Sequence, residues 1–126
     1  MPIALEMVLR LLLAAALGAI IGYQREKAGK QAGMRTHVLI STGAALISLV
    51  SIYGFGAASD PSRVAAGVVV GVGFLGAGVI LHRQGGIVAG LTTAATIWVM
   101  AGIGLAAGAG LYITAAVAAA IVLGVL

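Results

Sequence analysis

Long apolar stretches separated by short polar segments run through the whole chain. The longest stretch without a charged residue, His, Asn or Gln extends from Gly85 to Leu126, far more than the ~20 residues that cross a bilayer once as a helix. Transmembrane β-barrels need alternating apolar and polar residues, whereas these runs are continuous and rich in Leu, Ala and Gly. The pattern therefore predicts an all-α, polytopic membrane protein with about five transmembrane helices.

The polar segments and turn residues divide the chain into these expected helices. Residues 23–37 form the one sizeable polar loop, and Asp60-Pro61 provides a preferred N-cap followed by a preferred first helical residue. Gly85-Gly86 and Gly108-Ala109-Gly110 are the expected later turns. Within one transmembrane domain covering residues 1–126, spans are expected at about residues 3–22, 36–55, 61–81, 87–107 and 111–126.

The third of these spans is rich in glycine. Five glycines would weaken a helix in water by about 1 kcal/mol each, but in a membrane they let neighbouring helices approach closely. They occur on more than one side of the span, so we expect a central helix surrounded by neighbours. The expected packing residues are Gly67, Gly71, Gly73, Gly76 and Gly78.

Polar and aromatic residues mark the fourth span. Thr92, Thr93 and Thr96 are spaced to share one helical face, and interhelical hydrogen bonding against the glycine-rich span is the expected role. A polar lining for a pathway is the alternative. Trp98 lies too deep for an interfacial aromatic belt, so we expect it to pack or to contact a partner.

Composition narrows the functional classes. The chain is 62% hydrophobic and only 8% charged, whereas a soluble domain of this size carries roughly a quarter charged residues. The absence of cysteine excludes thiolate metal sites, disulfides and cysteine catalysis. The sequence also has no His-rich cluster, Gly-x-Ser-x-Gly motif or paired carboxylates, so we expect no enzyme activity and no bound cofactor. The net charge of +4 does not indicate nucleic acid, because the basic residues lie beside apolar spans.

The distribution of basic residues predicts the orientation. Lys and Arg accumulate in cytoplasmic loops of membrane proteins. One side of the expected topology carries Arg25, Lys27, Lys30, Arg35 and Arg83 in its loops. The other side carries Arg63 alone, so we expect the N-terminus outside and the C-terminus in the cytoplasm.

A first group of candidate functional residues lies on the expected outer side. Asp60 and Arg63 share the first turn of the third span, where they can form a helix cap with a local ion pair. Alternatively, Asp60 neutralises Arg10, a cation inside the first span that is costly unless paired or directed outward. Glu6 lies four residues before Arg10 and can also pair with it.

A second group lies on the expected cytoplasmic side. Arg35, Thr36 and His37 stand where the basic loop enters the second span. They can anchor the span with a Thr cap, or bind an anionic headgroup, phosphate or partner at the helix N-terminus. Arg25, Glu26 and Arg83 belong to the same face and can join this contact.

Several segments together resemble a known family. They are Leu11–Gln24 followed by Arg25-Glu26, Ala32-Gly33-Met34-Arg35-Thr36-His37, Asp60-Pro61-Ser62-Arg63, Gly73-Phe74-Leu75-Gly76-Ala77-Gly78 and Gly90-Leu91-Thr92-Thr93-Ala94-Ala95-Thr96-Ile97-Trp98. In this order they resemble the MgtC/SapB family of bacterial inner-membrane proteins. Gln24 replaces an acidic residue of the usual family pattern, and the soluble C-terminal domain of many members has no counterpart here.

The resemblance implies a five-helix domain that self-associates, with a dimer as the expected homo-oligomer. It also implies a role in adaptation to low magnesium, acid or host environments (the family is associated with virulence), through regulation of other membrane proteins including the ATP synthase. An oligomeric magnesium transporter is the alternative. The residues favour it less, because Mg²⁺ prefers carboxylate oxygens and the chain has only Glu6, Glu26 and Asp60, none near the expected bilayer centre.

Overall fold

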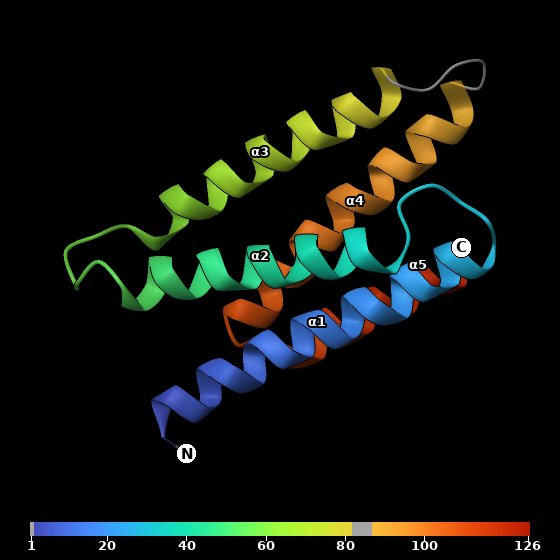
Figure 1. Cartoon of the computed structure of the whole chain (residues 1–126). Helices are drawn as coiled ribbons and strands as arrows, with labels where there is room; N and C mark the ends of the chain where they lie inside the picture. The colour runs from blue at the N-terminus through green and yellow to red at the C-terminus, as the bar shows by residue number, and fades with distance from the viewer. Residues whose placement is uncertain (1, 82–86) are drawn as a thin grey trace.

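The computed structural model describes residues 2–81 and 87–126. Helices account for most of these residues, and no strand occurs among them, which confirms the predicted all-α fold (Figure 1). The helices are α1 (Ile3–Lys27), α2 (Met34–Tyr53), α3 (Pro61–Leu81), α4 (Ile87–Gly108) and α5 (Tyr112–Val125).

Four of the helices, α1 to α4, are long and apolar enough to cross a membrane. The fifth, α5, has 14 residues. At 1.5 Å per residue this gives about 21 Å, less than the ~30 Å hydrocarbon core of a bilayer. At the other end of the chain, α1 continues past the apolar run to Lys27, because Gln24, Arg25 and Glu26 are good helix formers.

The centre of the bundle is α4, which contacts each of the other four helices. Within residues 2–81 and 87–126, α3 contacts only α2 and α4, and it runs along one side of the molecule (Figure 1). The expectation that the glycine-rich helix is central was therefore wrong for this chain. Glycine shows that a helix allows close approach, but it does not show which helix in the bundle is approached.

The glycines that are packed closely belong to α1 and α4. Gly18 of α1 lies against His37 and Ser41 of α2. Gly104 and Gly108 of α4 lie against Ser41 and Ala45 of the same helix. A Cβ atom at Gly108 would come within 2.6 Å of the carbonyl oxygen of Ala45. Both α1 and α4 thus present glycine to α2, which is the close packing that membrane helices use in place of a hydrophobic driving force.

Small and branched apolar residues fill the interior on both sides of α4. One cluster joins α1, α2, α4 and α5; it contains the fully buried Met100 together with Ala14, Ala45 and Ala115. A second cluster joins α2, α3 and α4 around Ile97 and includes Val72. The many alanines allow short distances between helix axes.

The two ends of the chain lie at opposite ends of the bundle. The N-terminus lies at the end that carries the 54–60 connection, and the C-terminus lies near the 28–33 connection (Figure 1). We call these the N-terminal end and the basic end. The basic end carries Arg25, Lys27, Lys30 and Arg35 in or beside its connection.

Candidate functional sites

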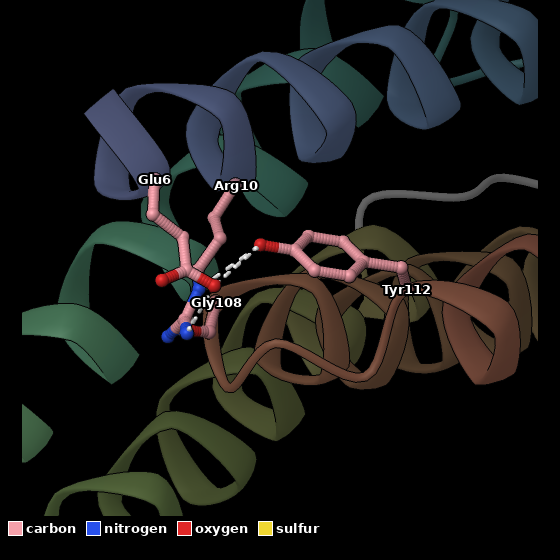
Figure 2. Close-up of polar contacts among 4 residues, drawn as sticks. All are labelled: Glu6, Arg10, Gly108 and Tyr112. Carbon is pink, nitrogen blue, oxygen red and sulfur yellow. Dashed lines mark hydrogen bonds and ion pairs between the residues drawn. The ribbon is translucent and has the colours of Figure 1, made fainter. Parts of the chain in front are cut away.

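Arg10 is the centre of a partly buried polar network at the N-terminal end. Its Nη1 donates to the carbonyl oxygen of Gly108 (3.0 Å), and its Nη2 donates to Glu6 Oε1 (3.1 Å). Its Nε donates to the hydroxyl of Tyr112 (3.3 Å), which in turn donates to Glu6 Oε1 (3.2 Å). Figure 2 shows how Glu6 and Arg10 reach from α1 toward Tyr112 and the end of α4.

The surroundings of Arg10 explain how a membrane protein accommodates this charge. Its side chain pairs with a carboxylate, and it also binds a carbonyl at the C-terminus of α4, where the helix dipole favours a cation. The ring of Tyr53 lies 5.8 Å from the guanidinium carbon. Gly110 follows α4 with φ of +88°, a conformation that favours glycine, and a Cβ there would come within 2.9 Å of Arg10 Nη2.

The structure does not bring Arg10 and Asp60 together as one sequence hypothesis proposed. Arg10 pairs with Glu6, whereas Asp60 caps α3: its Oδ1 accepts from the backbone N–H of Ser62 (3.0 Å) and from the Ser62 hydroxyl (2.7 Å). These bonds hold the pKa of Asp60 below its ordinary value. Arg63 is exposed, and no ion pair joins it to Asp60 in the described chain. The i,i+4 spacing made Glu6 visible as a partner for Arg10, but no sequence signal linked Arg10 to Gly108 or Tyr112.

Arg25 is the second buried cation and lies at the basic end. Its side chain is 3% exposed, and its Nη2 donates to the carbonyl oxygen of Gln31 (2.8 Å) and to the hydroxyl of Thr93 in α4. Its Nε–H has no hydrogen-bond partner. The chain's three carboxylates all lie in the described residues, and their one ion pair joins Glu6 to Arg10. Arg25 is therefore buried without a carboxylate.

His37 is fully buried in the first turn of α2 near Arg25. Its Nδ1–H donates to the carbonyl oxygen of Gly33 (3.0 Å), so the neutral ring presents Nε2 as an acceptor, and Nε2 has no partner. Arg35 is exposed and Thr36 is partly buried. Glu26 is exposed as well, with its Oε1 close to Gly33. Arg83, which the sequence placed in the same group, lies outside the described residues.

Among the described residues, no hydrogen bond joins the threonines of α4 to the glycines of α3. Thr93 is buried and accepts from Arg25 of α1, and Thr96 donates to the carbonyl oxygen of Thr92 in its own helix (2.8 Å). Thr92 is exposed, as is Trp98, at 60%. Trp98 thus faces lipid or a partner rather than the interior of this chain.

Most of the α3 glycines face open space. A Cβ at Gly67, Gly71, Gly73 or Gly78 would meet no atom within 4 Å, and Gly76 alone of the five lies against another helix, at Ala94 of α4. Their predicted packing role is thus seen within the chain for Gly76 only. Gly67 and Gly71 instead line an open apolar groove between α2 and α3, with a volume of about 680 Å³. Leu39, Gly43 and Ile47 form its α2 wall and Val64, Val68 and Leu75 extend its α3 wall.

No group of three or more His, Asp or Glu residues within residues 2–81 and 87–126 is arranged to hold a metal ion. The carboxylate oxygens nearest the interior, those of Glu6, face Arg10 and Tyr112.

The chain is similar to a known protein family over most of its length. Residues 11–126 match the model of the MgtC family. YhiD of Escherichia coli K12, described as a candidate magnesium transporter, is 54% identical over 114 residues, which cover 85% of this chain and 53% of YhiD. Protein MgtC of Salmonella typhimurium LT2 is 47% identical over 116 residues, covering 92% of this chain and 49% of that protein.

A third relative is also similar over most of this chain. Protein SrpB of Synechococcus elongatus is 47% identical over 115 residues, which cover 82% of this chain and 63% of SrpB. The chain thus spans about half the length of the first relatives it matches. No solved structure matches it.

Proposed function

Because this chain belongs to the MgtC family, we propose that it is an accessory membrane protein that works by helix–helix contact and not by catalysis. It would reside in the bacterial inner membrane, with the N-terminal end outside and the basic end in the cytoplasm. It would support adaptation to low magnesium or related stress by regulating another membrane protein, with the ATP synthase as one such target. Its working form would be a homodimer.

The α2–α3 groove carries this proposal. Apolar side chains facing outward are normal in a membrane, but exposed glycine is informative, because it lets a second backbone come close. Gly67 and Gly71 are exposed on the groove, and Gly43 of α2 is partly buried on the same groove; a Cβ at any of the three would meet no atom within 4 Å. The groove is apolar throughout, so a transmembrane helix fits it chemically.

A second copy of the chain is the occupant that the surface favours. Val70 and Phe74 of α3 are 75% and 80% exposed and stand beside Gly67 on the same helix, so a ridge of large side chains adjoins the groove. In a two-fold dimer the same patch meets itself, and each ridge then lies on the other copy's groove. The groove and the adjoining ridge of Val70 and Phe74 meet that requirement, because they lie side by side on the same face.

Two glycine variants of α3 test this interface. Gly71→Leu fills the groove, whereas Gly73→Leu places the same side chain at an equally open position of α3 outside it. Dimer formation in membranes, measured by energy transfer between labelled copies, is expected to fall in Gly71→Leu and to remain in Gly73→Leu. Equal dimer formation in both variants would contradict the proposed interface.

The stress role needs a cellular measurement. Both variants would be introduced in place of the native allele, and growth would be followed in low-magnesium medium. Gly71→Leu is expected to lose the growth advantage that Gly73→Leu keeps. Normal growth of a Gly71→Leu strain whose protein is monomeric would separate the stress role from self-association and reject the dimer as the working form.

Ion transport is the second candidate function, favoured by the description of YhiD as a candidate magnesium transporter. The described residues favour it less, because Arg10 and Arg25 are buried cations that repel a divalent ion. Purified protein in liposomes loaded with a Mg²⁺ indicator tests it directly. If Mg²⁺ flux exceeds that of liposomes without protein and falls in the Glu6→Gln variant, transport and not an accessory role is the function.

A further inference from the structure

The start of α2 leaves backbone donors without acceptors. The first N–H groups of any helix have no acceptor within the helix. The residue before Met34 is Gly33, and no side chain caps this helix. The N–H groups at Arg35 and Thr36 therefore have no hydrogen-bond acceptor among the described residues, whereas Met34 N lies against Gly22 of α1. The helix dipole makes this end attractive to an anion.

Arg25 adds a second observation that points to an anion at this end. Its helix packs against the start of α2, because Gly22, one turn earlier, lies against Met34. Its guanidinium reaches the carbonyl oxygen of Gln31, shortly before Met34. It is almost fully buried, lacks a carboxylate and keeps one N–H unpaired. A buried cation without a counter-ion is costly, so it favours an anion from outside the chain.

Charges on the exposed side complete the surroundings. Arg35 and Lys30 are exposed beside the start of α2 and add positive charge. Glu26 opposes them: its Oε1 would lie 2.8 Å from a Cβ at Gly33, yet it accepts no hydrogen bond from the first turn of α2 in the described chain. The carboxylate of Glu26 is therefore a competitor for an anion at this position.

We propose that the first turn of α2, together with the nearby Arg25 and Arg35, binds a phosphate group. The phosphate belongs either to an anionic phospholipid or to free inorganic phosphate. Its oxygens accept from the N–H groups of the first turn and from Arg35, while Arg25 contributes its charge through the poorly screened interior. This site does not depend on the groove between α2 and α3 or on self-association.

General attraction of the basic end to anionic lipid is the simpler explanation that the test must separate. Exposed Lys and Arg near a membrane surface attract anionic headgroups without a defined site. In that case each basic residue contributes alike, and Lys27 matters as much as Arg35. A defined site makes Arg35 important and Lys27, an exposed residue in the last turn of α1, nearly neutral.

The experiment uses the full chain, labelled with ¹⁵N, in a neutral detergent. Inorganic phosphate is titrated while the amide signals of Met34, Arg35 and Thr36 are followed, with chloride at equal ionic strength as the blank. In a second arm the chain is placed in nanodiscs of phosphatidylcholine with or without phosphatidylglycerol. Shifts with inorganic phosphate identify a site for free phosphate, and shifts with phosphatidylglycerol alone identify a lipid site.

Four variants decide between a site and general attraction. Arg35→Gln is exposed and should fold, and it is expected to weaken binding about tenfold, as loss of a charged hydrogen bond does. Arg25→Gln is expected to weaken binding as well, Glu26→Gln to strengthen it, and Lys27→Gln to leave it within about twofold. Absence of amide shifts in both arms, or equal weakening by Lys27→Gln and Arg35→Gln, would overturn the proposal.

Discussion

Gly104 of α4 lies directly against the backbone of Ser41 in α2. A Cβ at Gly104 would also come within 2.9 Å of the Ala44 side chain, so the two helices touch with no room for a methyl group. Gly102, two residues away on the same helix, is exposed and faces open space. Substitutions at Gly104 and Gly102 can therefore separate the effect of glycine on helix–helix contact from its effect on helix propensity.

We therefore expect Gly104→Ala to destabilise the bundle by about 1–3 kcal/mol, because overpacking forces α2 and α4 apart. Gly102→Ala should be neutral or stabilising by up to about 1 kcal/mol, since alanine is the better helix former. Unfolding in mixed micelles with increasing SDS measures both. Equal stability of the two variants would show that the α2–α4 contact adapts to a methyl group.

The hydroxyl of Tyr112 tests the Arg10 network. Tyr112→Phe removes the acceptor for Arg10 Nε and the donor to Glu6 while keeping the ring, so a loss of about 0.5–1.5 kcal/mol in unfolding free energy is expected. Tyr23→Phe, at an exposed position of α1, is the control and should change little. The same unfolding measurement applies, and an unchanged Tyr112→Phe variant would mean that water replaces the hydroxyl.

The sequence predicted five helices because turn or capping residues bound the apolar runs, and the first four helices are long enough to cross a bilayer. It did not predict which helix is central. The exposed glycines of α3 and the packed Gly104 and Gly108 of α4 look alike in sequence, and only the tertiary arrangement separates them.

The candidate sites show the same division between local and distant contacts. The Arg10–Glu6 pair follows from helical spacing and was visible in the sequence. The contacts of Arg10 with Tyr112 and of Arg25 with Thr93 join residues far apart in the chain, and the sequence did not predict them. Asp60 was correctly placed as the cap of α3 because capping acts over two or three residues.

Ser51 joins the end of α2 to the start of α3. Its buried hydroxyl donates to the carbonyl oxygen of Pro61 (2.6 Å) across the 54–60 connection. Ser51→Ala is expected to lower the unfolding free energy by about 0.5–1.5 kcal/mol. Ser59→Ala removes an exposed hydroxyl that bonds within the connection, to Gly56, and should cost less. Hydrogen exchange at the first turn of α3 should rise in Ser51→Ala only; a rise in both variants would contradict a specific role for Ser51.

The single aspartate of the chain allows a direct titration, since ¹³C-labelled aspartate reports on Asp60 alone. Its carboxylate accepts two hydrogen bonds from Ser62, which favour the charged form, so the pKa in the folded protein lies below the ordinary value. Ser62→Ala removes the hydroxyl donor but keeps the backbone donor, and the pKa of Asp60 should rise part of the way back.

The sign of the linked stability effect follows from that lowered pKa. A group whose pKa is lower in the folded state stabilises the fold above its unfolded pKa, and the contribution is lost as pH falls through the folded pKa. The start of α3 should therefore fray in acid, below the ordinary range of an aspartate, and hydrogen exchange at Ser62 and Arg63 should increase there. Asp60→Asn, which keeps an oxygen acceptor but does not titrate, should remove this acid-dependent step. A step of equal size in Asp60→Asn would assign it to Glu6 or Glu26, the only other carboxylic side chains.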